Sequence, residues 1–266
     1  MNRAWRLDGA RALITGGSSG IGLAVAHELA ALGAELVLVA RGQERLERAR
    51  SAVLEHCPAC RIEVIAADVS LDEDRQRIAA EAGDELQVLV NNAGTNIRKR
   101  MTALSLAEYR QVQSTNIESC FEMCRLLYPL LQRGQPASVV NNASVAGLVH
   151  LRTGAPYGMS KAAMIQLTRN LAVELAGEGV RVNAVAPWYI RTPLADQVLQ
   201  DAGYRQAVLD RTPMGRVGEV EEHHVESARL EVDDLAGRLS GVGEVERTPF
   251  LLRFRAEGCA GISSQG

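Results

Sequence analysis

The sequence is poor in aromatic residues and contains no long apolar run. Only 4% of its 266 residues are Phe, Trp or Tyr, and no window approaches the roughly 18 consecutive apolar residues that mark a membrane-crossing helix. Lys and Arg are scattered along the chain, and the formal net charge is -3. We therefore expect no membrane partner, and no nucleic-acid partner either, because such proteins carry a clustered basic patch.

Cysteine is present in an odd number, five, which does not suit a disulfide framework. Residues 1–9 lack the apolar stretch of a secretory signal. Both observations predict a cytoplasmic protein with reduced thiols. Cys57 and Cys60 have the spacing of a redox dithiol or of half a zinc site, but no second ligand pair follows them. We interpret them as incidental thiols and expect no metal.

Apolar residues make up 47% of the chain, and short runs rich in Val, Ile, Leu and Ala alternate with longer amphipathic stretches. This alternation is typical of βαβ units around a parallel sheet. The runs lack strict alternation because both faces of such a sheet are covered. We predict an α/β protein with a doubly wound parallel sheet and helices on both faces. Its strands are expected at 10–14, 35–40, 61–66, 86–91, 138–142 and 180–186, and its helices at about 20–32, 43–55, 71–81, 105–132 with a break near 114, and 155–177.

The segment 187–218 is irregular, with Pro193, Pro213 and several glycines. It predicts a long loop with short helices over the strand ends, and such loops are often substrate lids. The composition changes again beyond Gly218, since 219–247 is crowded with charge, while 249–254 is suited to a short strand. We divide the chain into a domain at 1–218 and a divergent, atypical C-terminal segment at 219–266, which we expect to be part of the same domain.

A glycine-rich turn joins the first predicted strand to the first helix. A helix N-terminus offers unpaired N–H groups and a partial positive charge, and glycines let the backbone approach a pyrophosphate closely. A turn that serves packing alone remains the alternative, although its place at the first βα junction of the repeating pattern favours a dinucleotide. The residues expected to bind it are Gly16, Ser18, Ser19, Gly20, Ile21 and Gly22.

Arg41 ends the second predicted strand, where the adenosine ribose of a dinucleotide should lie. An acidic residue at this point would favour NAD, whereas an arginine suits a 2′-phosphate, so we expect NADP rather than NAD. The alternative is an arginine that only solvates a strand end. Asp68, followed by Val69, is placed either to meet the adenine edge or to cap the next helix.

Tyr157 and Lys161 are four residues apart on a predicted helix, and Ser144 precedes Tyr157 by thirteen positions. Residues i and i+4 share a helix face, so the Lys161 ammonium can lie beside the phenol and favour its ionised form. A phenol with an ordinary pKa of about 10 then becomes a usable proton donor or acceptor. A merely packed aromatic is the alternative for Tyr157.

Together these motifs resemble the short-chain dehydrogenase/reductases, in particular the tropinone-reductase-like and 3-ketoacyl-carrier-protein-reductase-like members. The resemblance spans about 7–218 and implies a Rossmann fold. The matching motifs are the glycine-rich turn at 15–22, Asp68, Asn-Asn-Ala-Gly at 91–94, Asn116, Asn-Ala-Ser at 142–144, Tyr157 with Lys161, Arg-Val-Asn at 181–183 and the stretch 187–192.

The resemblance implies roles for four catalytic residues. Tyr157 would protonate the carbonyl oxygen as hydride arrives, or act as the base in the reverse direction. Ser144 would hydrogen-bond the same oxygen. Lys161 would hold the nicotinamide ribose hydroxyls and lower the pKa of Tyr157. Asn116 resembles the residue that holds a water in a proton relay, with a cap at a helix break as the alternative.

The resemblance also extends the cofactor site to Asn92, Ala93 and Gly94, and to a stretch over the nicotinamide with Pro187, Ile190 and Thr192. Thr192 as a simple turn residue before Pro193 is the alternative. Position alone suggests the walls of a pocket for a moderately apolar carbonyl compound. They are Asn96, Val145, His150, Leu151, Trp188, Tyr189, Leu194 and Tyr204.

The family usually continues with a helix, a Thr-Gly turn, a last strand and an Asp-Gly-Gly segment, and none of these follows Gly218 here. A replaced C-terminus, for instance through a frameshift near Glu222, is one hypothesis. The resemblance implies an enzyme, an NADP-dependent oxidoreductase that interconverts a ketone and a secondary alcohol, acting as a homodimer or homotetramer. A 3-ketoacyl thioester reductase of fatty-acid synthesis is an alternative, and an inactive cofactor-binding scaffold or regulatory protein is another.

Overall fold

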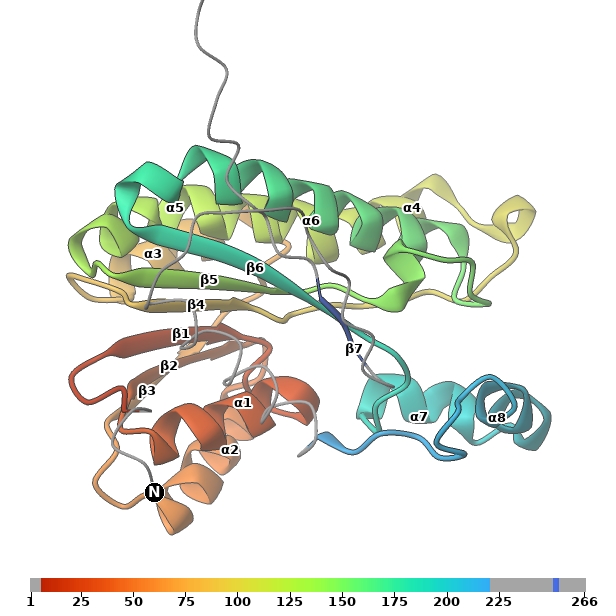
Figure 1. The fold of residues 1–266 in the computed structure, drawn as a ribbon, viewed down its shortest axis with the longest axis horizontal. Helices are drawn as coiled ribbons and strands as arrows, with labels where there is room; N and C mark the ends of the chain where they lie inside the picture. Colours follow the sequence, from red (N-terminus) through yellow and green to blue (C-terminus); the bar gives the residue numbers. More distant parts are fainter. Residues whose placement is uncertain (1–5, 221–250, 254–266) are drawn as a thin grey trace, which may run out of the picture.

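The computed structural model describes residues 6–220 and 251–253, which form a seven-stranded sheet between two layers of helices (Figure 1). The strand order is β3-β2-β1-β4-β5-β6-β7. The first six strands run parallel, and β7 pairs antiparallel with β6. The strands are β1 (Arg11–Thr15), β2 (Glu35–Ala40), β3 (Ile62–Ala66), β4 (Val88–Asn91), β5 (Ala137–Asn142), β6 (Val180–Pro187) and β7 (Leu251–Arg253).

Two helices, α1 (Gly20–Ala31) and α2 (Gln43–His56), cover one face of the sheet (Figure 1). The opposite face carries α3 (Asp72–Glu81), α4 (Leu106–Gln113), α5 (Ser119–Arg133) and α6 (Ala155–Glu174). Two shorter helices, α7 (Pro193–Leu199) and α8 (Ala202–Leu209), follow β6. Single turns complete the described elements: η1 (Met101–Ala103), η2 (Ser114–Glu118), η3 (Val145–Gly147) and η4 (Ala176–Glu178).

The core has two halves, one on each side of the sheet. Leu13 of β1 packs in a cluster with Met123 and Leu127 of α5, while its neighbour Ile14 packs in a second cluster with Leu29 of α1 and Leu46 of α2. Successive residues of a strand point to opposite faces, so a strand covered on both sides must be apolar throughout. The prediction of a doubly wound α/β sheet is confirmed.

The order of the strands reverses between β1 and β4, because the chain first builds outward to β3 and then returns to the other side of β1. In open α/β sheets, ligands bind at such a switch point, beyond the carboxyl ends of the strands. The segments after β1, β4, β5 and β6 leave the sheet at this same edge. The topology therefore brings together the segments in which the sequence predicts a site.

The elements agree with most expectations in detail. The predicted helix 105–132 is interrupted by a π-helical turn, η2, at the expected break near Ser114. The region after β6 contains two short helices, and the strand predicted at 249–254 appears as β7. The sheet is therefore mixed, with one antiparallel edge strand. The remainder of the segment 219–266, beyond Val220 and apart from β7, lies outside the described residues. None of the described helices combines the length and apolar character that crossing a bilayer requires.

Gly22 lies where a methyl group does not fit. An ideal Cβ at this residue would lie 2.3 Å from the Gly16 carbonyl oxygen and 2.5 Å from Asn92 Nδ2. Alanine gains up to about 1 kcal/mol of helix propensity over glycine, but forcing atoms into a packed site costs about 1–3 kcal/mol. We expect Gly22→Ala to lower the free energy of unfolding in urea. Gly177→Ala is the matched control, because its Cβ would meet nothing within 4 Å; an equal loss in both variants would contradict the steric argument.

Candidate active site

A cavity of about 440 Å³ opens at the carboxyl edge of the sheet. It runs from the glycine-rich turn and the end of β2, past β4 and β5, to α6 and the segment that leads into α7. Most of the sequence-predicted site residues line it, and they come from widely separated parts of the chain. They are Gly16, Ser18, Ser19, Gly20, Ile21, Arg41, Asp68, Val69, Asn92, Ala93, Gly94, Ser144, Leu151, Tyr157, Lys161, Pro187, Trp188, Tyr189, Ile190, Thr192 and Leu194.

Six of the predicted residues are not among those that line the cavity: Gly22, Asn96, Asn116, Val145, His150 and Tyr204. His150 is exposed, and Asn116 is completely buried behind the site. Tyr204 of α8 lies behind Tyr189, which does line the cavity. The two hydroxyl oxygens are 2.5 Å apart. Arg152 stacks over the Tyr204 ring at 4.8 Å from its centroid. Tyr204 therefore supports the wall of the cavity.

The glycine-rich turn has the backbone geometry of an anion cradle. Gly16 and Gly20 have φ values of 69° and 55°, in the left-handed region that favours glycine. Ser19, the N-cap of α1, makes no side-chain capping hydrogen bond, and the first turn of α1 contains no acidic residue. The N-terminal N–H groups and the partial positive charge of this helix end are therefore free of a competing anion from its own first turn.

Asn92 fastens this turn to the neighbouring strands. Its Nδ2 donates to the carbonyl oxygens of Thr15 at 3.0 Å and Gly16 at 3.3 Å, and its Oδ1 accepts from Asn142 Nδ2 at 2.8 Å. The bonds link the ends of β1, β4 and β5. Thr192 closes the other side of the turn as the N-cap of α7, with Ala195 N donating to its Oγ1 at 3.2 Å.

Arg41 lies at the far end of the cavity with its side chain 70% exposed. Its Nη1 is 4.0 Å from Asp68 Oδ2, a surface contact that contributes little to stability. Asp68 Oδ1 accepts from both the backbone N–H and the hydroxyl of Ser70, at 3.0 and 2.7 Å. Asp68 thus closes the turn before α3, whose N-cap residue is Leu71. Arg41 and Asp68 both line the cavity. The predicted contact of Asp68 with the adenine edge stays a prediction.

Tyr157 and Lys161 lie together on α6, with Lys161 Nζ 5.8 Å from the centre of the Tyr157 ring. Lys161 Nζ donates to the Asn142 carbonyl oxygen at 2.6 Å, and burial lowers the pKa of Lys161 to about 8. Burial raises the pKa of Tyr157, while a hydrogen bond with Ser144 and the charge of Arg98 oppose this rise. The expected lowering of this pKa by Lys161 is therefore wrong for this structure: desolvation dominates, and the opposing cation is Arg98.

Asn116 holds three parts of the site together from behind. Its Oδ1 accepts from Thr95 N at 2.8 Å, and its Nδ2 donates to the Thr95 carbonyl oxygen and to Ser160 Oγ, each at 3.0 Å. Thr95 follows β4, Asn116 is in η2, and Ser160 is on α6. Both amide hydrogens are used, so the side chain is a structural joint in the wall of the site.

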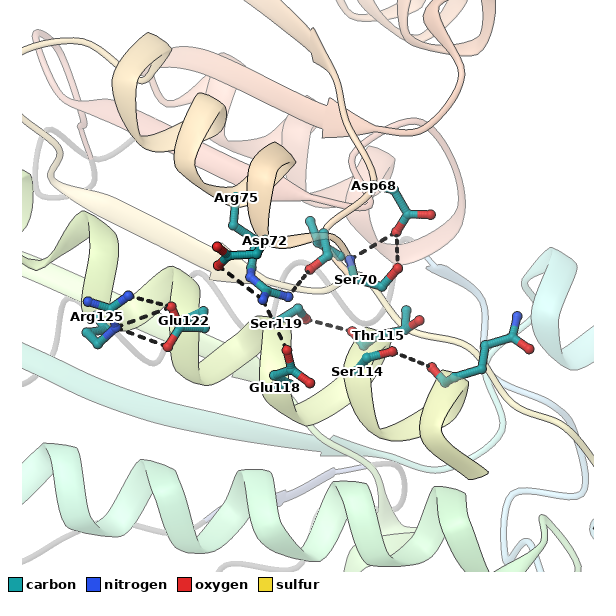
Figure 2. A network of polar contacts seen from close by, with 12 residues as sticks. Asp68, Ser70, Asp72, Arg75, Ser114, Thr115, Glu118, Ser119, Glu122 and Arg125 are labelled. Carbon is teal, nitrogen blue, oxygen red and sulfur yellow. Dashed lines mark hydrogen bonds and ion pairs between the residues drawn. The ribbon is translucent and has the colours of Figure 1, made fainter. Parts of the chain in front are cut away.

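The π-helical turn that carries Asn116 is anchored on its outer side by Arg75 of α3 (Figure 2). The Arg75 side chain is almost fully buried, and it donates to Glu118 Oε1 and to the Val69 carbonyl oxygen, both at 3.0 Å. Ser119, the first residue of α5, donates to the carbonyl oxygen of Thr115 in this turn at 2.6 Å. A buried guanidinium needs such partners, and here they fix α3 against the interrupted helix.

Sequence reasoning missed several residues that line the cavity: Arg45, Thr95, Arg98, Gln111, Thr115, Thr153, Ala195 and Gln197. Two of them carried a signal. Arg45 is four residues after Arg41, in the first turn of α2, and Arg98 follows Gly94 in the loop that leaves β4 at the switch point. Gln111 and Thr115 come close only through the fold, because they lie in the middle of the chain on α4 and η2.

Comparison with known proteins agrees with this arrangement. A family model described as short chain dehydrogenase matches residues 10–203. The chain belongs to the short-chain dehydrogenase/reductase family.

A tropinone reductase homologue of Arabidopsis thaliana is 44% identical over 227 residues, which cover 83% of this chain and 84% of that protein. The crystal structure of levodione reductase has a TM-score of 0.80 at 32% identity, over 86% of this chain and 92% of that one. The structure of L-sorbose reductase from Gluconobacter frateurii, complexed with NADPH and L-sorbose, has a TM-score of 0.78 at 29% identity, over 85% and 91%. The chain is thus similar to tropinone-reductase-like oxidoreductases.

The lowered pKa of Lys161 predicts a pH-dependent stability. Between about pH 8 and the ordinary value of 10.5, the unfolded chain binds more protons at this residue than the folded chain, so the free energy of unfolding rises with pH in this window. Below about pH 8, burial of the charged ammonium lowers the free energy of unfolding by its full amount. We expect wild type to gain stability relative to Lys161→Met between pH 7 and pH 9.5, measured by urea unfolding. A difference that stays constant over this range would contradict the assignment.

Proposed function

We propose that this protein is an NADP-dependent oxidoreductase that interconverts a ketone and a secondary alcohol. The observation that carries the proposal is the joint placement of Ser144, Tyr157 and Lys161 in the cavity that also contains the glycine-rich turn. A proton donor, a second hydrogen-bond donor and a cation then surround the space in which a carbonyl group would react. This arrangement favours an enzyme over an inactive scaffold.

In the reductive direction, the carbonyl oxygen accepts hydrogen bonds from Ser144 and Tyr157. When bound, NADPH supplies the hydride that adds to the carbonyl carbon. Tyr157 gives its proton to the oxygen, which becomes the hydroxyl of the product. The raised pKa of Tyr157 keeps the phenol protonated at neutral pH, as an acid must be before it acts. Ser144 stabilises the negative charge that develops on the oxygen during the transfer.

Lys161 and Asn116 serve the same step indirectly. We assign Lys161 to the ribose hydroxyls of the nicotinamide nucleoside, which its ammonium can reach from the same helix as Tyr157. We keep Asn116 in the proton relay that restores Tyr157. Because both amide hydrogens of Asn116 already bond to Thr95 and Ser160, a relay water would donate to a backbone carbonyl oxygen of η2.

The geometry of the cofactor end fits a phosphorylated dinucleotide. The turn at 16–22 provides the left-handed glycines and the uncapped helix end that a pyrophosphate requires. Arg41 and Arg45 both line the cavity beside the end of β2, and the arginine fork matches a 2′-phosphate. We therefore propose NADP in preference to NAD. The L-sorbose reductase structure with NADPH supports this choice.

The substrate, the assembly and the compartment are the remaining assignments. Similarity to tropinone reductase homologues favours a compact ketone over a 3-ketoacyl thioester. We propose a homodimer or homotetramer built on the helices near 105–132 and 155–177, that is α4, α5 and α6, where the apolar residues Phe121 and Val173 are exposed. The cytoplasm remains our proposed compartment, although one relative carries the name chloroplastic.

Tyr157→Phe tests the proposed acid. The variant keeps the ring and its packing but has no proton to donate, so we expect kcat to fall by about 10²–10⁴-fold. The assay follows NADPH absorbance with a panel of cyclic ketones, ketoacyl thioesters and sugars. The affinity for NADPH, measured by fluorescence titration, should change little. Turnover that survives in Tyr157→Phe would defeat the assignment.

Arg41→Ala tests the choice of cofactor. Loss of a charge-assisted hydrogen bond to the 2′-phosphate should raise KM for NADPH by about 10–100-fold and leave KM for NADH unchanged. Arg48→Ala is the matched control, an arginine on the exposed face of α2 that pairs with Glu44. If wild type prefers NADH, or if both cofactors weaken equally in Arg41→Ala, the 2′-phosphate role is wrong.

A further inference from the structure

Arg98 is a cation at the reaction end of the cavity. It lies in the loop between β4 and η1 and lines the cavity together with Tyr157 and Tyr189. Its positive charge acts on both phenols, since it lowers the pKa of each against the larger effect of burial. The cation therefore lies beside the space in which the carbonyl compound would react.

The guanidinium of Arg98 makes only weak hydrogen bonds with the described part of the protein. Nη1 lies 3.4 Å from Gln197 Oε1 and Nη2 lies 3.4 Å from the Leu194 carbonyl oxygen, so both contacts are long and both acceptors are neutral. Nε is buried without a hydrogen-bond partner. Among the described residues, Arg98 forms no ion pair with a carboxylate. A partly desolvated cation without an anion costs free energy that a bound anion would offset.

The other charged residues that line the cavity, among those described, also leave Arg98 without an anionic partner. Among the described lining residues Asp68 is the single carboxylate, and it lies at the adenosine end, where it faces Arg41. Lys161 directs its ammonium to the Asn142 carbonyl oxygen. At the reaction end, the uncharged lining side chains include Thr153, Trp188 and Leu194, which leave the charge of Arg98 unopposed.

We propose that Arg98 binds a carboxylate group of the substrate, so that the preferred substrates are ketones that carry an acid group and the corresponding hydroxy acids. The proposal rests on the function proposed above. Two N–H groups of a guanidinium match the two oxygens of a carboxylate, which gives both affinity and orientation. The two contacts of Arg98 with the α7 segment place the bound acid beside that segment, at Leu194 and Gln197.

The test uses two ketones that share one ring and differ at the carboxyl group, the anion 4-oxocyclohexanecarboxylate and its neutral methyl ester, with NADPH as reductant. Wild type should show the higher kcat/KM with the acid. Arg98→Gln should lower kcat/KM for the acid by about 10–100-fold and change the ester little. Arg98→Lys, which keeps the charge but not the fork, should restore part of the preference. Arg100→Gln, the same substitution at an exposed arginine two residues along, is the control and should change neither substrate.

A second measurement does not depend on turnover. Calorimetry with NADP-saturated protein compares cyclohexanecarboxylate with cyclohexanecarboxamide, and the acid should bind more tightly to wild type but not to Arg98→Gln. Equal binding of acid and amide, or an equal loss of activity with acid and ester in Arg98→Gln, would overturn the proposal and leave Arg98 as a tether for α7. Turnover that persists in Tyr157→Phe would overturn the proposed chemistry instead, so the two failures are distinguishable.

Discussion

The buried amide of Asn116 is the constraint on which the site depends. It joins the loop after β4, the π-helical turn and α6 through three hydrogen bonds in a completely buried environment. Thr95 is next to Gly94 and Ser160 is next to Lys161, so this one side chain fixes two walls of the cavity relative to each other. A buried polar group left without partners costs about 1–3 kcal/mol, which makes any shift of one wall unfavourable for the other.

A second constraint is the distribution of charge along the cavity. Arg41 and Arg45 lie at one end, Arg98 at the other, and Lys161 between them, with Asp68 as the one acidic residue among the described lining residues. Such a cavity favours ligands with negative charge at both ends, as a phosphorylated dinucleotide and an acidic substrate would provide together. Tyr157 lies beside Lys161 on α6, where burial keeps the phenol protonated and Arg98 limits the rise of its pKa.

Local sequence patterns were sufficient to predict the positions of the strands and of the helix break. Apolar runs located the six parallel strands to within about two residues, and the polar break near Ser114 located η2, because burial and backbone hydrogen bonding act within each element. The roles of Asp68, Arg98 and Tyr204 could not be predicted from such local patterns. The turn that Asp68 closes, the cation that acts on Tyr157 and the support behind Tyr189 all depend on which distant segments the fold brings together. The direction of the Tyr157 pKa shift failed for the same reason, since desolvation is a property of the assembled cavity.

Hydrogen bonds join the two ends of the segment that follows β6, residues 189–218. Arg191 N donates to the Gly218 carbonyl oxygen at 2.8 Å, and Gly218 N donates to the Tyr189 carbonyl oxygen at 3.0 Å. These bonds pin the two ends of a loop that contains α7 and α8, whose own apolar cluster includes Leu199, Val208 and Val217. β7 meets the site in a different place, where it pairs with Val185, Ala186 and Pro187 at the end of β6. The cavity wall formed by Pro187, Ile190 and Thr192 is therefore held from two sides: Pro187 by the sheet, and Ile190 and Thr192 by a loop that closes without β7.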